Sequence, residues 1–214
     1  VLGNGTTAVD LGTVTVNGAL SVTGTAGITD SGVITVSGTS LFVSNAAITL
    51  DLVNAMSGAV SVTHTGASDV SIDNGITALD LGTVSVGQNF SATSGGVISD
   101  SGVITVAGNA TFVTDVDDID IVLDSTNAIT GALTFTTQTS GSTNGADITF
   151  NNGSTAISLA AFATEGNLTL ISDAAFTLTA LTVNGDLSVT SNSNTIGQSA
   201  VLTVSGTSSF TTTT

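Results

Sequence analysis

The sequence predicts an all-β fold, a parallel β-helix or β-solenoid of about nine coils, and three observations lead to it. The passage LGTVTVNGALSVT at 11–23 returns with few changes at 81–93 and 178–190. β-Branched residues recur at every second position in short segments, which indicates strands, and Asn, Gly, Asp and Ser form the turns between these segments. Proline is absent, which suits central strands that donate every ladder hydrogen bond, and helix signals are scarce. Repeats of this kind bury their apolar faces against neighbouring repeats.

Each coil is recognised by the first apolar residue of a strand that ends at a glycine turn, as in the strand 14–16 before Asn17-Gly18. Successive markers lie 19–29 residues apart. The shorter spacings fit coils of two or three strands joined by tight turns, and the longer ones need an extra loop. We expect such a loop at 136–147, which is polar and glycine-rich. The markers are, in order, Val14, Ile34, Val60, Val84, Ile104, Leu133, Phe162, Leu181 and Leu202.

The coils group into longer units. The passage pairs divide the chain into superrepeats of approximately 11–80, 81–177 and 178–214, the second of which has gained a coil. The first residue is Val1 rather than methionine, inside a repeat-like phrase. We therefore expect residues 1–214 to be a single solenoid segment of a longer repeat protein.

Parallel stacking follows from the spacing, because a chain without intervening helices that returns every 20–29 residues places each strand beside its equivalent in the next coil. Nine coils at the usual strand separation give a rod on the order of 40 Å long. Inward side chains then form ladders along the axis. We expect one core ladder of Val14, Ile34, Val60, Val84, Ile104, Leu133, Leu181 and Leu202, and a second of Phe42, Phe112 and Phe210.

A β-sandwich array is the alternative architecture. Asn-Gly pairs such as those at 17–18 and 184–185 permit the hairpins that a sandwich requires. Repeats of this length are short for a seven-strand sandwich and irregular for a propeller blade, so the solenoid is favoured while the sandwich stays open.

Charge restricts the partners. The chain carries 16 acidic residues and no Lys or Arg, for a net charge of −16. Nucleic acids and anionic lipid head groups are bound through Lys and Arg, so neither is expected as a partner. No apolar run is long enough to cross a bilayer, which argues against membrane insertion. The chain has no site for trypsin, which cuts after Lys and Arg, and it contains no cysteine.

The densest acidic cluster lies in TDVDDIDIVLD and supplies the one candidate metal site. Ca²⁺ prefers six to eight hard oxygen ligands, and strand alternation would place Asp118, Asp120 and Asp124 on one face. The cluster matches neither an EF-hand loop nor the nonapeptide calcium repeat, so the alternative is a solvated acidic edge. The candidate ligands for weak Ca²⁺ binding are Asp115, Asp117, Asp118, Asp120 and Asp124.

We expect no enzymatic activity, and a polysaccharide-active β-helix enzyme is kept only as a remote alternative. Glycoside hydrolysis needs two suitably spaced carboxylates, which the acidic cluster could supply. However, the chain has no Trp or Tyr to form a sugar subsite and no Arg or Lys for lyase chemistry. His64, the single histidine, has no second His or Cys to bind a metal and is expected in a turn or on the surface.

Blocks such as LTVNGDLSVTSNSNTIGQSAVLTVSGTSSF at 181–210 and GTVSVGQNFSATSGGVISDSGVITVAGNATF at 82–112 resemble the repeats of filamentous-haemagglutinin-like exoproteins. The similarity covers nearly the whole chain, is weakest at 136–175, and lies in the style of the repeat rather than in a functional motif. It implies a right-handed β-helical stalk of a giant bacterial surface protein, extracellular or displayed on the cell surface. It transfers no catalytic residue.

These observations predict a structural segment of a giant extracellular surface protein or filament, forming a stiff, protease-resistant rod. The expected partners are further repeats or copies of the chain, end to end and side by side, with divalent cations offsetting the charge. The competing expectation is an adhesin whose site for a glycan or surface protein lies at 136–147 or in the Asp115–Asp124 region.

Overall fold

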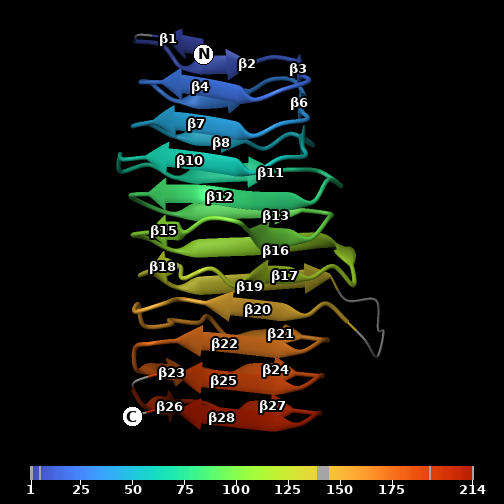
Figure 1. The fold of residues 1–214 in the computed structure, drawn as a ribbon, viewed down its shortest axis with the longest axis vertical. Coiled ribbons are helices and arrows are strands. Elements are labelled where there is room, and N and C mark those ends of the chain that lie inside the picture. Colours follow the sequence, from blue (N-terminus) through green and yellow to red (C-terminus); the bar gives the residue numbers. More distant parts are fainter. Residues whose placement is uncertain (1, 5, 139–144, 193, 214) are drawn as a thin grey trace.

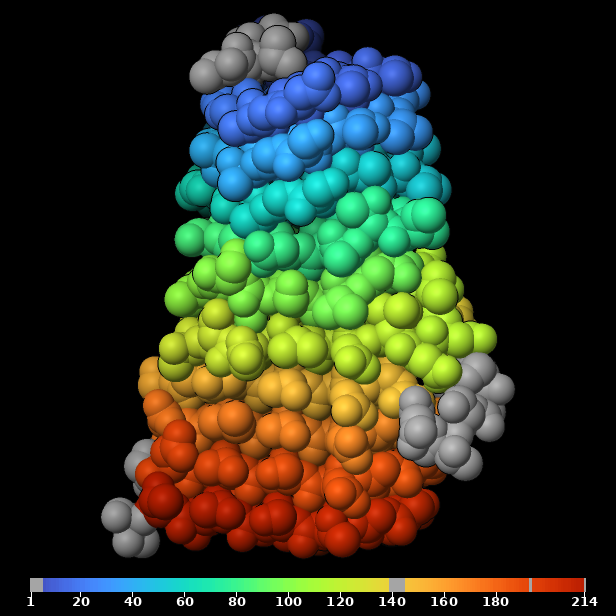
Figure 2. Space-filling view, turned by 45° about the vertical axis from the view of Figure 1, so that its right-hand side comes forward, coloured from blue at the N-terminus to red at the C-terminus, as the bar shows by residue number. Residues whose placement is uncertain are grey.

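The computed structural model of the chain describes residues 2–4, 6–138, 145–192 and 194–213. These residues form an all-β solenoid in which parallel strands stack in about ten turns, one more than the nine expected. Figure 1 shows the coils stacked along one axis with the two termini at opposite ends, and Figure 2 shows them as successive bands. No helix that could span a membrane occurs in the described part of the chain.

Two large sheets carry most of the strands. The thirteen-stranded sheet runs β1 (Leu2–Asn4), β4 (Leu20–Gly24), β7 (Ser40–Ser44), β10 (Val60–His64), β12 (Leu79–Val86), β14 (Ile98–Asp100), β17 (Ile121–Leu123), β20 (Ile148–Asn151), β22 (Leu168–Ser172), β25 (Leu187–Ser191) and β28 (Ser208–Thr212). Off this path, β15 (Ile104–Val106) pairs with β12, and β18 (Ala128–Ile129) pairs with β15. The seven-stranded sheet runs β2 (Val9–Leu11), β5 (Ile28–Asp30), β8 (Ile48–Leu50), β11 (Val70–Asp73), β13 (Phe90–Ser94), β16 (Ala110–Asp117) and β19 (Leu133–Gln138).

Three smaller sheets complete the coils. They contain β3 (Val14–Val16), β6 (Ile34–Val36) and β9 (Ala55–Met56); β21 (Phe162–Thr164), β24 (Leu181–Val183) and β27 (Leu202–Val204); and β23 (Phe176–Leu178) with β26 (Ile196–Gln198). Neighbouring coils pair in parallel, as in the register of Val14 with Ile34 and of Leu181 with Leu202. Because hairpins would pair strands antiparallel, the alternative of a β-sandwich array is wrong.

Most strands are short because turn residues interrupt the β-branched alternation after three to five positions. In β4, Leu20, Val22 and Gly24 are buried, while the two residues between them are half-buried. Glycine is required in the turn before the next strand, because Gly18, Gly38 and Gly58 stack on one another. A β-carbon at Gly58 would lie 2.6 Å from the carbonyl carbon of Gly38. The repeated Asn-Gly and Ser-Gly turns therefore allow the close approach of successive coils.

The phase of the coils was predicted wrongly at Val60 and Leu133. Both begin the longer type of strand, and Val60 lies opposite Ser40 and Leu81. The single ladder is also wrong at Val84, which lies inside β12 and opposite Val62. The predicted members pair within three different sheets, as Val14 with Ile34, Val84 with Ile104, and Leu181 with Leu202. The strand beside β6 in the next coil is β9, and the strand beside β15 is β18; both begin with Ala and lack the Ile-Thr-Val signal.

The predicted phenylalanine ladder is also wrong, although two of its members are core residues. Phe42 and Phe112 are fully buried but lie in different sheets, and Phe210 pairs with Val189 in the last coil and is 51% exposed. The ring-to-ring contacts, with centroids 5.6–6.0 Å apart, connect Phe90, Phe112, Phe135, Phe150 and Phe162.

The strands exchange sheets twice along the axis. The long strands β4, β7 and β10 pair with one another in successive coils. In the next coil, β12, which fuses both short strands, pairs with β10, and the long strand β13 pairs with β11. The long strand returns to the thirteen-stranded sheet at β22, which pairs with β20. The polar segment 136–147, expected as a loop, begins inside β19, and its residues 139–144 lie outside the described part of the chain.

Candidate functional site

The acidic cluster is divided between two sides of a turn. Asp118 has a positive φ of 58° and ends the extended chain that leaves β16, so it cannot share a strand face with Asp120 and Asp124. Asp120 precedes β17 and Asp124 follows it. The predicted common face for these three carboxylates is therefore wrong. Within the described residues, no group of three or more His, Cys, Asp or Glu side chains is placed to hold a metal ion.

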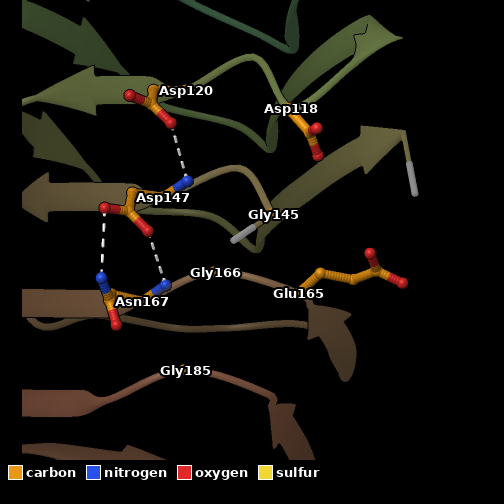
Figure 3. Close-up of a pocket in the computed structure, with 8 residues that line it drawn as sticks. All are labelled: Asp118, Asp120, Gly145, Asp147, Glu165, Gly166, Asn167 and Gly185. Atoms are coloured by element: carbon orange, nitrogen blue, oxygen red, sulfur yellow. Dashed lines mark hydrogen bonds between the residues drawn. The ribbon is translucent and has the colours of Figure 1, made fainter. Parts of the chain in front are cut away.

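Two of these aspartates line a groove of about 430 Å³ on the side of the rod (Figure 3). In the view of Figure 3, the carboxylates of Asp118 and Glu165 lie on the right, while those of Asp120 and Asp147 lie on the left. One Glu165 oxygen, Oε2, is buried without a hydrogen bond among the described residues. The full lining is Asp118, Asp120, Gly145, Asp147, Glu165, Gly166, Asn167 and Gly185.

The left-hand carboxylates of the groove join one coil to the next. Asp120 Oδ1 accepts a hydrogen bond from the backbone amide of Asp147 at 2.8 Å. The two oxygens of Asp147 accept from the amide and the Nδ2 of Asn167 at 2.7 and 3.2 Å. Asn167 Oδ1 accepts from Asp186, and Asp186 Oδ1 accepts from Thr207, at 2.8 and 2.7 Å. These side chains join five consecutive coils, and each of them accepts a hydrogen bond through at least one oxygen.

A second ladder of the same kind lies beside the seven-stranded sheet. The amide of Asn89 donates to Asp69 Oδ1 at 3.3 Å, that of Asn109 to Asn89 Oδ1 at 2.9 Å, and that of Ala132 to Asn109 Oδ1 at 2.9 Å. Each of these residues directly precedes a strand of the sheet. The side chain of Asp or Asn at this position therefore accepts the backbone amide of the equivalent residue in the following coil.

Buried polar columns occur in two equivalent copies. Asn54 Nδ2 donates to Asp30 Oδ2 at 2.7 Å, and Asn127 Nδ2 donates to Asp100 Oδ2 at the same distance. The Oδ1 of each asparagine accepts from the first amide of β6 or β15, at 2.8 and 2.7 Å. Burial raises the pKa of Asp100, and its hydrogen bonds with Asn127 and Ser125 act in the opposite direction.

A third residue, again an asparagine, closes each column in the coil where the strands exchange sheets. Asn74 Oδ1 accepts from the Met56 amide at 2.8 Å, and Asn74 Nδ2 donates to the Met56 carbonyl at 3.0 Å. Asn152 makes the same two bonds to Ile129, at 2.8 and 3.0 Å. Both asparagines are 0% exposed, and the glycine after each has a φ of 55° or 50°. The two copies are thus one structural device used twice.

Sequence reasoning missed these columns, although a signal for them exists. The segments DNGITA at 73–78 and NNGSTA at 151–156 share the Asn-Gly pair and the later Thr-Ala, and both follow a strand. His64 was also misjudged: it lies buried in β10, its Nε2 is 3.0 Å from the Ser68 hydroxyl, and its Nδ1 has no partner among the described residues. Burial lowers the pKa of His64, and the nearby Asp69 partly opposes this.

The C-terminal coil presents an open apolar edge. Every side chain of β28 is exposed, whereas the paired strand β25 alternates between buried and half-buried positions. A groove of about 370 Å³ at this end is lined by Leu178, Ile196, Leu202 and Phe210, among others. The interior of the solenoid is therefore accessible at this edge.

Comparisons with known proteins give one match. A family model described as repeats of unknown function (DUF5649) matches residues 1–63, 67–136 and 165–214. No curated protein and no solved structure matches the chain significantly. The matched residues include the equivalent polar columns Asp30–Asn54 and Asp100–Asn127, so both belong to the repeat itself.

Proposed function

This chain belongs to the DUF5649 family of repeats of unknown function, and we propose that it is a structural segment that forms a stiff rod. The observation that carries the proposal is that each coil is joined to the next in three ways. These are parallel strand pairing, the buried apolar interior, and side-chain hydrogen bonds such as those of the Asp120 and Asp69 ladders. In such an array, stability grows with the number of nearest-neighbour interfaces.

In its finer form, the proposal places the segment in a giant extracellular surface protein or filament of a bacterium, similar to filamentous-haemagglutinin-like exoproteins. The style of the repeats supports this placement. The lack of Lys and Arg supports protease resistance outside the cell, because trypsin-like proteases find no site. Further repeats or copies would continue the rod end to end. Divalent cations would reduce the repulsion between rods lying side by side.

A second candidate is an adhesin segment that binds a glycan or a cell-surface protein. The groove of about 430 Å³ supports it, because it lies in the region where such a site was expected and exposes Asp118. Binding on a glycan array that is lost in the double variant Asp118→Ala, Glu165→Ala would favour adhesion.

The rod proposal is tested by electron microscopy of two copies joined head to tail in one chain. A stiff segment gives a straight particle about twice as long as the single copy, which itself measures on the order of 50 Å for ten coils. Two particles at variable angles would contradict the proposal. Protease resistance is measured with thermolysin, which cuts at apolar residues, because resistance to trypsin follows from composition alone.

A further inference from the structure

We propose that the edge formed by Val33, Val53, Ile76 and Val116 is a docking surface for a cationic amphipathic segment of another protein. This valine edge runs along the axis over five coils, where the chain leaves the seven-stranded sheet, and the coil of β13 contributes Gly95 to it. In Figure 1 the turn between β11 and β12 and the end of β16 lie at the right-hand edge of the view. The proposal goes beyond the role of a rod and does not depend on it.

The valine edge is continuous because glycines leave room for its side chains. A β-carbon at Gly75 would lie 2.5 Å from Val53 Cγ1, and one at Gly95 would lie 2.9 Å from Val116 Cγ2. The Gly95 amide donates to the Gly75 carbonyl at 2.6 Å, so these two positions are directly stacked. Ile76 follows Gly75 and therefore lies between Val53 and Val116.

Val33 extends the valine edge by one coil. The Ile34 amide donates to Asn54 Oδ1 at 2.8 Å, which places the residues before them, Val33 and Val53, in adjacent coils. Their exposed fractions are 41% and 63%, that of Ile76 is 83% and that of Val116 is 42%. Side chains of the same types are 0–2% exposed in most interior ladders. An exposed apolar row of this kind indicates an interaction surface.

Carboxylates accompany the valine edge on the same corner. Asp51 and Asp73 follow the paired residues Leu50 and Ile72 of adjacent coils. Asp115 lies two coils further along the axis, and a β-carbon at Gly95, in the coil between, would lie 3.1 Å from Asp115 Oδ1. Burial raises the pKa of Asp73, and the negative charges of Asp115, Asp30 and Asp51 raise it further. These charges are therefore close enough to repel one another.

The counter-charge has to come from another molecule, because the chain contains no Lys or Arg. A second copy of the chain would add carboxylates to carboxylates. A divalent ion would neutralise the charge but leave the valines exposed. A segment with apolar side chains on one side and Lys or Arg beside them satisfies both parts of the surface.

The test uses the whole chain and a synthetic helical peptide with a leucine face flanked by lysines, with binding measured by fluorescence anisotropy at low salt. The double variants Val53→Ser, Ile76→Ser and Asp51→Asn, Asp73→Asn each weaken binding at least about tenfold. Raising the salt concentration weakens binding of the unmodified chain but has less effect on the charge variant. Cooperative thermal unfolding at a temperature no lower than that of the unmodified chain shows that the substitutions leave the fold intact.

Matched controls separate a built surface from general attraction of a cation to an acidic protein. Val201→Ser, an exposed valine in the last coil, and Asp10→Asn in the first coil leave the affinity unchanged. A peptide with serine in place of leucine binds at least about tenfold more weakly. If this peptide binds equally well, or if the Val53→Ser, Ile76→Ser chain keeps its affinity, the proposal is wrong and the attraction is only electrostatic.

Discussion

Asp73 and Asn151 hold equivalent positions where the strands exchange sheets, and they accept the same hydrogen bond although they differ in charge. Asp73 Oδ1 accepts from the Gly75 amide at 2.8 Å, and Asn151 Oδ1 accepts from the Gly153 amide at 2.9 Å. The carboxylate is therefore not needed for this turn. Because burial and neighbouring carboxylates raise the pKa of Asp73, the folded chain holds its proton more tightly than the unfolded chain does. Stability is consequently lost as the pH rises through the pKa of the folded state.

Asp73→Asn is expected to raise the free energy of unfolding at pH 7, by less than about 1 kcal/mol because the group is partly exposed to solvent. The gain shrinks as the pH falls through the raised pKa and vanishes below the ordinary value of 3.8. Urea unfolding measured at several pH values checks this.

Asn151→Asp provides the reverse exchange at the second copy. It keeps an acceptor for the Gly153 amide but introduces a charge, so it should destabilise the chain at pH 7 and lose this effect in acid. Equal stability of Asp73→Asn and the unmodified chain across the whole pH range would contradict the expected repulsion at this corner.

At the scale of the elements, alternation and glycine turns were enough to predict parallel coils. The start of a coil was mispredicted where asparagine replaces the β-branched residue that marks it. The position held by Val14 and Ile34 is taken by Asn54 in the next coil, and the position held by Ile104 is taken by Asn127. No Ile-Thr-Val signal marks β9 or β18, so the marker predicted for the first of these coils, Val60, falls on the strand after β9.

The exchange of sheets could not be predicted from strand patterns, because long and short strands share the same alternation and fit either sheet. Buried hydrogen bonds of Asn74 and Asn152 to the main chain of the preceding coil accompany the two exchanges, and strand patterns do not reveal them. The predicted common face of Asp118, Asp120 and Asp124 was wrong because alternation of side chains requires a continuous strand. The positive φ of Asp118 interrupts that strand.

The polar columns should be the most sensitive elements of the fold. Asn127→Ala removes the buried acceptor of the Ile104 amide and the donor to Asp100 Oδ2, with an expected loss of about 2–4 kcal/mol in the free energy of unfolding. Asn54→Ala should have a similar effect, because it holds the same position in the first column.

Asn109→Ala is the matched control for the Asn127 variant. It also removes an acceptor from a backbone amide, that of Ala132, but its hydrogen bond is exposed and water can replace it. Chemical denaturation of these variants separates the two cases. A loss at Asn127 no larger than that at Asn109 would show that the buried columns do not determine stability.

At the scale of the whole molecule, the charge is unevenly distributed along the axis. All 16 acidic residues lie at or before Asp186, so the segment 187–214 carries no charge. The two edges of the thirteen-stranded sheet are β1 and β28, at opposite ends of the rod. A second copy could therefore add its β1 to β28 as the next parallel strand without bringing charges together at this end. Such a head-to-tail contact would not close on itself, so repeated addition of copies would give a filament.

Substitution of Phe210 tests whether the open edge drives this association. Phe210 lies opposite Val189 on the exposed face of the last coil, so Phe210→Asp should place a charge where the next copy would bury an apolar ring. In sedimentation, the mean mass of the unmodified chain should rise with concentration and with added salt, which screens the net charge of −16. The Phe210→Asp chain should stay a monomer under the same conditions, while Val103→Ser, an exposed valine on the side of the rod, should associate like the unmodified chain. Equal masses for all three chains would mean that the apolar edge does not bind a second copy.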